Sequence, residues 1–352
     1  MADVLEYLRR AVEDHASDLF IVAGGSVSEK VGGRLVSLSG EKVFPQETEA
    51  LISAIYEMAD RDMAEFRRTG DDDFSFAVPG LARFRVNAYR QRGSLAAVVR
   101  MVSFEIPDWK TLGIPEEVMS LADVGHGMVL VTGTAGSGKS TTQACVIDRI
   151  NRIRQAHIIT LEDPIEFLHR DRESIVSQRE IAIDTADYLS ALRSCLRQAP
   201  DVILLGEMRD HDTIRTAMTA AETGHLVIAT LHTKGAVNTI DRIVDAFPPA
   251  QQAQIRVQLS MVLHTVVSQQ LLPDKEGGRV PAFEIMHVNG AIRSMIRDSK
   301  SHQIDNAIAS GAAEGMVNMD QSILALYKAG KITLETALAH ADNPDQLRRR
   351  LG

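Results

Sequence analysis

Residues 127–142 read GMVLVTGTAGSGKSTT, and the class of fold can be inferred from this segment. An apolar run at Met128–Val131 leads into a glycine-rich loop, which is followed by Lys139 and a helical pattern over Ser140–Ile153. The loop fits G-x-x-x-x-G-K-[ST], with an additional glycine at position 136. Glycines let backbone N–H groups turn toward a phosphate, and the N-terminus of the following helix attracts the same anion. The order of strand, loop and helix therefore predicts a site for a nucleoside triphosphate rather than a simple turn before a helix.

Each residue type in this loop has an expected role. Lys139 should reach the β- and γ-phosphates, and the Ser140 hydroxyl should be a ligand of Mg²⁺. We therefore expect a nucleoside triphosphate and Mg²⁺ to bind here. The residues predicted to bind the nucleotide in and after the loop are Gly133, Thr134, Ala135, Gly136, Ser137, Gly138, Lys139, Ser140 and Thr141.

Hydrolysis also needs a carboxylate near the metal, a carboxylate that handles the attacking water, and positive charge for the transition state. Glu207 ends the hydrophobic run from Asp201, at the type of strand end where α/β sheets bind ligands. Another strand end carries three acids, Glu162, Asp163 and Glu166, and spacing does not choose among them. Two histidines, His225 and His232, flank the apolar run 226–230, so we consider them as site residues beside the structural role that a histidine usually has.

The alternation of apolar runs and helical patterns after residue 108 predicts an α/β domain over 109–352. Short apolar runs at 128–131, 158–161, 202–205 and 226–229 alternate with helical patterns, as in a parallel sheet covered by helices. Beyond Pro249 we expect mostly helix, with an amphipathic stretch near 250–270 and shorter ones around 291–297, 319–329 and 333–339.

Residues 1–108 predict a smaller α+β domain with a linker marked by Pro107, Gly113 and Pro115. The expected elements are strands at 18–22, 34–38 and 95–102, a helix over 45–68, and a hairpin of 74–78 with 83–89. Its polar face is rich in arginine, at Arg83, Arg85, Arg90, Arg92 and Arg100. This face is either solvated or, in a ring enzyme, directed at a neighbour's nucleotide. A groove for single-stranded nucleic acid is disfavoured because Phe84 and Arg85 point to opposite sides of a strand.

Composition limits the possible partners and compartments. The 352 residues carry a net charge of −9, which gives no general attraction to nucleic acid or anionic lipid. Cys145 and Cys195 are too few for a disulfide framework or a four-thiolate zinc site. No apolar run reaches the ~18–20 residues that cross a bilayer. We expect a cytoplasmic protein that neither inserts in the membrane nor binds nucleic acid.

Taken together, the motifs resemble those of the secretion-type hexameric ATPases, and within them the PilT-like retraction ATPases of type IV pili. The matching stretches are ASDL at 16–19, RFRVNAYRQRG at 83–93, GTAGSGKSTT at 133–142, ITLEDPIEF at 159–167, GEMRD at 206–210, TAAETGHLVIATLHT at 219–233 and AIRSMIRD at 291–298. The resemblance implies a PAS-like N-terminal domain, a RecA-like P-loop ATPase domain with a helical C-terminal region, and a homohexamer. It also implies that the nucleotide is ATP.

The resemblance also implies roles for residues that spacing leaves open. Glu207 matches the Walker B acid that holds Mg²⁺, Glu166 the catalytic base, and His232 and His225 the His box. Arg85 and Arg100 match arginines that complete a neighbouring subunit's site. The expected function is retraction of a type IV pilus through a platform protein at the inner face of the cytoplasmic membrane. Alternatives are a pilus-extension or type II secretion ATPase, a nucleic-acid translocase, and an adaptor that binds ATP without hydrolysing it.

Overall fold

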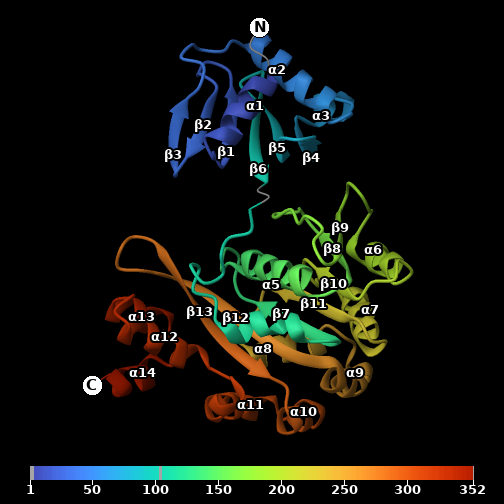
Figure 1. The fold of residues 1–352 in the computed structure, drawn as a ribbon, viewed down its shortest axis with the longest axis vertical. Coiled ribbons are helices and arrows are strands. Elements are labelled where there is room, and N and C mark those ends of the chain that lie inside the picture. The colour runs from blue at the N-terminus through green and yellow to red at the C-terminus, as the bar shows by residue number, and fades with distance from the viewer. Residues whose placement is uncertain (1–3, 103–104, 352) are drawn as a thin grey trace. The chain divides into compact units, whose positions relative to one another are not determined.

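A computed structural model describes residues 4–102 and 105–351 of the chain, which divides into two units (Figure 1). Unit 1 comprises Met1–Glu105 with Glu166–Leu168, and unit 2 comprises Ile106–Ile165 with His169–Gly352. The domain boundary predicted near residue 108 lies close to this division in the sequence and stays a prediction.

Unit 1 is an antiparallel sheet with helices packed on one face. Its described residues form six strands in the order β3-β2-β1-β6-β5-β4. The strands are β1 (Asp18–Val22), β2 (Ser28–Val31), β3 (Arg34–Ser37), β4 (Asp71–Val78), β5 (Ala82–Gln91) and β6 (Ser94–Val102). The helices are α1 (Val4–Glu13), α2 (Pro45–Met58) and α3 (Ala64–Thr69).

Alternation along the predicted hairpin determines which of its side chains enter the core of unit 1. Phe84 and Val86 on β5 are fully buried, whereas Arg83 and Arg85, which alternate with them, lie on the other face at intermediate exposure. The single helix expected over 45–68 is wrong, because the chain turns between α2 and α3. Asp60 adopts a left-handed φ of 49°, and the Asp62 carboxylate then accepts a hydrogen bond from Ala64 N at 2.9 Å, as at a new helix start.

Unit 2 contains the predicted parallel sheet. Among its described residues, seven strands pair in the order β13-β12-β7-β11-β10-β8-β9. They are β7 (Gly127–Thr132), β8 (His157–Glu162), β9 (Ile175–Glu180), β10 (Val202–Leu205), β11 (Leu226–Leu231), β12 (Leu263–Pro273) and β13 (Arg279–His287). The helices are α4 (Glu116–Met119), α5 (Lys139–Ile153), α6 (Tyr188–Cys195), α7 (His211–Glu222), α8 (Ala236–Asp245), α9 (Pro249–Val262), α10 (Gly290–Arg297), α11 (Ile304–Ser310), α12 (Met319–Lys328), α13 (Leu334–His340) and α14 (Pro344–Leu351).

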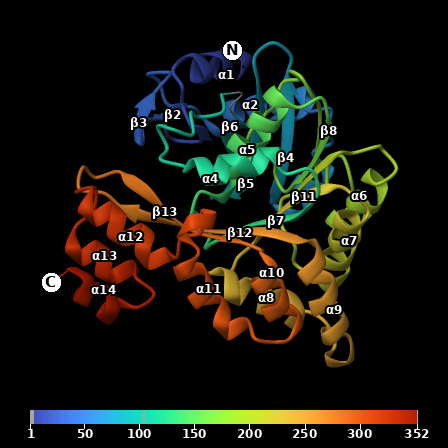
Figure 2. The same cartoon turned by 60° about the horizontal axis from the view of Figure 1, so that its bottom comes forward.

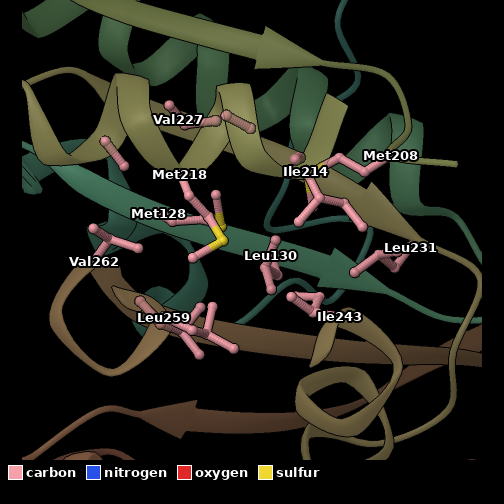
Figure 3. Close-up of a cluster of buried hydrophobic side chains, with 14 of the residues drawn as sticks. Met128, Leu130, Met208, Ile214, Met218, Val227, Leu231, Ile243, Leu259 and Val262 are labelled. Atoms are coloured by element: carbon pink, nitrogen blue, oxygen red, sulfur yellow. The ribbon is translucent and has the colours of Figure 1, made fainter. Parts of the chain in front are cut away.

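The strands of this sheet are apolar on both faces because each face meets a layer of helices. Val129 and Val131 on β7 pack in one cluster with α5, whereas Met128 and Leu130 pack in a second cluster with α7 to α10. Figures 1 and 2 show α5 on one side of β7 and β12, with α8 to α11 on the other. Figure 3 shows the second cluster, in which Met128 and Leu130 lie among Met218, Ile243 and Leu259.

The expectation of mostly helix beyond Pro249 is wrong for β12 and β13. This segment forms an antiparallel hairpin in register from Thr265↔His287 to Pro273↔Arg279, and β12 also pairs in parallel with β7. The apolar run at the end of α9 continues into β-branched Thr265, Val266 and Val267, which favour a pleated strand buried on both faces. The sequence of this segment is compatible with helix or strand, and pairing within the sheet makes it a strand. The predicted helices near 291–297, 319–329 and 333–339 are present as α10, α12 and α13.

Candidate active site

The phosphate-binding loop lies between the carboxyl end of β7 and the first residue of α5. Gly133, Gly136 and Gly138 all have positive φ, at 143°, 74° and 90°. At Gly133 a Cβ atom would lie 2.3 Å from the backbone oxygen of Gln269 and 2.6 Å from Ser137 Oγ, so a side chain has no room there. Glycine is thus required in the loop for two reasons: the backbone adopts positive φ angles, and β12 approaches it closely.

Gln269 on β12 joins the loop to the helix behind it. Its side-chain oxygen accepts a hydrogen bond from Thr142 Oγ1 at 2.8 Å, and its Nε2 would lie 2.8 Å from a Cβ at Gly138. Both Gln269 and Thr142 are buried. The sequence could not single out this glutamine, because its segment was expected to be helical.

The polar groups of the loop fit a bound phosphate chain. Lys139 Nζ donates to the backbone oxygens of Gly133 and Thr134 at 3.0 Å each, which keeps its charge at the mouth of the loop. The Ser137 hydroxyl is buried without a hydrogen-bond partner among the described residues. A buried hydroxyl normally has a partner, so this one is suited to a ligand oxygen.

Glu207 and His232 are brought together at the same edge of the sheet. They follow β10 and β11, whose register pairs Leu205 with Ala229, and the distance from His232 Nε2 to Glu207 Oε2 is 3.4 Å. The other Glu207 oxygen contacts the Arg209 guanidinium. Arg209 was not predicted as a site residue, although it lies in the stretch GEMRD.

Glu162, Asp163 and Glu166 come at and after the end of β8. Glu162 Oε1 accepts hydrogen bonds from Thr160 Oγ1 at 2.6 Å and from Gln178 Nε2 at 3.2 Å, so its carboxylate is fixed at the strand end. Asp163 and Glu166 are exposed, as a group that meets substrate or water needs to be.

Tyr188, the first residue of α6, contacts this edge and was not predicted. A Cβ at Gly206 would lie 2.7 Å from the Tyr188 hydroxyl and 3.4 Å from Glu162 Cα. Burial and then the charges of Glu207 and Asp163 raise the pKa of Tyr188 above its ordinary value. Tyr188 therefore stays a neutral phenol beside the acids, and nothing in its sequence context indicates this position.

His225 is separated from the loop by the length of a strand. β11 and β7 run in parallel with Leu226 opposite Gly127 and Leu231 opposite Thr132, so His225 lies at the amino edge of the sheet. The six residue intervals from His225 to Leu231 put His225 roughly 20 Å from the carboxyl edge. There His225 Nδ1 is 2.9 Å from the Ala220 backbone oxygen, at the end of α7. Within one subunit the structure thus does not bring His225 to the predicted nucleotide site.

The two arginines expected to act on a neighbour face each other in unit 1. Arg85 on β5 and Arg100 on β6 are register partners. Arg100 Nε donates to Asp18 Oδ1 at 2.9 Å, and its side chain remains 63% exposed. Arg85 lies 4.0 Å from Asp73. Each arginine is thus held by a carboxylate while it stays accessible.

A cavity of about 720 Å³ in unit 2 opens beside the phosphate loop. Gly138 and Thr141 line it together with three segments that were not predicted to belong to the site, namely 110–114, 274–276 and 329–331. Its volume falls within the range of sites for small molecules and cofactors. Phosphate loop, strand-end acids and adjoining cavity define this molecule as a nucleotide-binding α/β protein.

Comparison with known proteins identifies the family. The family model described as "Type II/IV secretion system protein" matches residues 2–337, and the chain belongs to this family. It is 44% identical over 343 residues to the type IV pilus retraction ATPase PilT of Pseudomonas aeruginosa, covering 97% of this chain and 99% of that protein. A twitching motility protein of Neisseria gonorrhoeae is 41% identical over 345 residues, covering 98% of this chain and 92% of that protein.

Solved structures agree with this assignment. A crystal structure of the pilus retraction motor PilT with bound ADP aligns with a TM-score of 0.90 at 44% identity, covering 99% of this chain and all of that one. The Legionella pneumophila ATPase DotB aligns with a TM-score of 0.80 at 26% identity, covering 95% and 93% of the two chains. The predicted α/β fold, the P-loop ATPase class and the resemblance to PilT-like proteins are therefore confirmed.

Among residues 4–102 and 105–351, no helix combines the length and the apolar character that crossing a bilayer requires.

Proposed function

We propose that this protein is the ATPase motor of a type IV pilus and that it drives retraction. The observation that carries this proposal is the match of nearly the whole chain to a relative named as a retraction ATPase. By contrast, the type II secretion protein E of Xanthomonas campestris aligns with 68% of this chain and 43% of its own length. The phosphate loop and the strand-end acids supply the ATPase part of that function.

In this proposal the nucleotide lies on the loop and extends into the adjoining cavity. Backbone N–H groups of 133–138 and Lys139 hold the phosphates, and the Ser137 hydroxyl, buried without a partner among the described residues, accepts or donates a further hydrogen bond. The base and ribose occupy the cavity of about 720 Å³.

The donor set also fits Mg²⁺, which we include as a cofactor. The Ser140 hydroxyl and the Glu207 carboxylate are oxygen ligands, which this ion prefers over nitrogen and sulfur. The described residues contain no group of three or more His, Cys, Asp and Glu side chains that could hold a metal, so substrate phosphates and water would complete the coordination. When bound, the ion neutralises charge on the phosphates.

The remaining roles belong to side chains of this chain. Glu166 accepts the proton of the attacking water, while His232 and Arg209 orient the Glu207 carboxylate. Arg85 and Arg100 stabilise the transition state in the site of a neighbouring subunit within a homohexamer, as arginine fingers do in other NTPases. The ring acts on a platform protein at the inner face of the cytoplasmic membrane.

The test is Mg²⁺-dependent ATP hydrolysis by the full chain over a series of protein concentrations, beside Glu166→Gln. We expect specific activity to rise with concentration, because the site is completed by a second subunit. Glu166→Gln should keep nucleotide affinity and lose about 10²- to 10⁴-fold in turnover, the usual contribution of a general base. Glu173→Gln, the same change at an exposed glutamate, is the control.

Two results would count against the proposal. Wild-type turnover in Glu166→Gln would reject the role of Glu166, and ATP binding without turnover at any concentration would favour the non-hydrolysing adaptor.

Deletion of the gene tests whether the motor retracts or extends the pilus. Loss of a retraction motor leaves surface pili in place or increases them, whereas loss of an extension motor removes them.

A further inference from the structure

Strand β9 carries two side chains that hold the segment containing Glu166. β9 pairs in parallel with β8, with Thr160 opposite Gln178 and Glu162 opposite Glu180. Because side chains alternate along a strand, Gln178 and Glu180 lie on the same face of β9. This face is turned to the chain that leaves β8.

Glu180 holds the backbone at Ile165, the residue that precedes Glu166. Glu180 Oε2 accepts a hydrogen bond from the backbone N–H of Ile165 at 3.2 Å. Glu180 is 3% exposed and Ile165 is 4% exposed, so water does not compete for this contact. The backbone N–H of Glu180 donates to Asp184 Oδ2 at 2.8 Å, which fixes the strand end itself.

Gln178 holds the backbone at His169, three residues after Glu166. Its side-chain oxygen accepts a hydrogen bond from His169 N at 2.8 Å, and its Nε2 donates to Glu162 Oε1 at 3.2 Å. One glutamine therefore joins the start of the segment, at Glu162, to its end, at His169. The backbone is held on both sides of the residues 166–168.

We propose that Gln178 and Glu180 are positioning residues that set the location of the Glu166 carboxylate for hydrolysis. The inference rests on the role proposed above for Glu166. An exposed side chain takes its position from its backbone, and here the backbone is fixed one residue before Glu166 and three residues after it. A displacement of about 1 Å in a reacting group can lower a rate by about 10²-fold.

Variants at position 180 separate the hydrogen-bond acceptor from the charge. Glu180→Leu removes the acceptor for Ile165 N–H at similar side-chain size, whereas Glu180→Gln keeps an amide oxygen in the same place. In steady-state ATP hydrolysis by the full chain, Glu180→Leu should lower kcat about 10- to 100-fold. Glu180→Gln should retain at least about half of wild-type kcat, and the exposed Glu173→Gln should match wild type.

Nucleotide affinity distinguishes positioning from general damage. The KM for ATP and the Kd of a fluorescent ATP analogue should change less than about twofold in Glu180→Leu, because uniform binding resides in the phosphate loop. If Glu180→Leu does not fold, Gln178→Met removes the other acceptor and should give the same fall in kcat. A fall in affinity equal to the fall in kcat would overturn the proposal.

A double variant tests whether the effect passes through Glu166. Residual single-turnover rates of Glu166→Gln and of Glu166→Gln with Glu180→Leu should be equal, since groups that act as a unit are not additive. Wild-type kcat in Glu180→Leu beside an impaired Glu166→Gln would overturn this inference alone. So would equal losses in Glu180→Gln and Glu180→Leu. Wild-type turnover in Glu166→Gln would overturn the proposed role of Glu166 and this inference with it.

Discussion

Glu284 on β13 is a buried acid whose replacement should stabilise unit 2 at alkaline pH. Its side chain is 5% exposed, and Oε1 accepts a hydrogen bond from the backbone N–H of Ala236, the first residue of α8, at 2.7 Å. The pKa of Glu284 is raised from 4.5 to about 7, and burial is the largest cause. The charges of Asp342 and Asp305 contribute to this rise, whereas backbone hydrogen bonds from Ala236 and Met319 act against it.

Whether the free energy of unfolding rises or falls with pH depends on which state, folded or unfolded, binds the proton at Glu284. Between pH 4.5 and about 7 the folded state is protonated at Glu284 while the unfolded state is ionised, so the free energy of unfolding falls as pH rises. At about 1.4 kcal/mol for each pKa unit, the full loss is about 3 kcal/mol above pH 7.

The variant Glu284→Gln keeps an acceptor for Ala236 N–H and cannot ionise. We expect its free energy of unfolding to equal that of wild type near pH 5 and to exceed it by up to about 3 kcal/mol near pH 8. For a unit of this size, the same gain corresponds to a rise of roughly 6–12 °C in Tm. Urea and thermal unfolding of the nucleotide-free full chain at these two pH values measure the difference.

The matched control is Glu222→Gln, which makes the same chemical change at an exposed position of α7. Its unfolding curve should follow wild type at both pH values. Equal stability of Glu284→Gln and wild type near pH 8 would refute the reasoning, because an ionised Glu284 would then carry no cost in the folded state. A lower stability of Glu284→Gln near pH 5 would show that a second carboxylate contact matters more than protonation.

Three further outcomes concern the proposed active site. Lys139→Ala should weaken binding of a fluorescent ATP analogue at least about tenfold, because a charge-assisted contact to phosphate is worth ~1.5–3 kcal/mol; unchanged affinity would place the phosphates elsewhere. Gly133→Ala should lower both Tm and nucleotide affinity, since its Cβ would lie 2.3 Å from a backbone oxygen, with a stability loss of about 1–3 kcal/mol; a wild-type Tm would contradict this crowding. Arg100→Ala should reduce hydrolysis in assembled rings, and mixing with Lys139→Ala subunits should restore part of it; mixtures no more active than the sum of their components would reject action in trans.

The phosphate loop and the parallel strands could be predicted from sequence because their determinants are local. Loop 133–138 requires glycines at fixed spacing, and the apolar runs of β7, β8, β10 and β11 match strands buried on both faces. The hairpin of β4 and β5 could be predicted equally well, since the alternation of polar and apolar residues and the turn at Pro79-Gly80 act within a few residues.

Long-range pairing decided the parts that could not be predicted. The run from Leu263 to Pro273 fits helix or strand until it pairs with β7, and Gln269 reaches the phosphate loop as a consequence of that pairing. Tyr188 likewise reaches Gly206 through the packing of α6, and no local pattern encodes such a contact.

The P-loop, the strands of the parallel sheet and the arginine-rich antiparallel hairpin could be read from the amino-acid sequence, because those features depend on residues close together in the chain. Which side chains from distant segments meet is known only from the three-dimensional fold. It brings Glu207 to His232 and places Gln178 and Glu180 against the segment of Glu166. Contacts of this kind depend on strand order and register, which are set by the whole hydrophobic core and not by any single stretch of sequence.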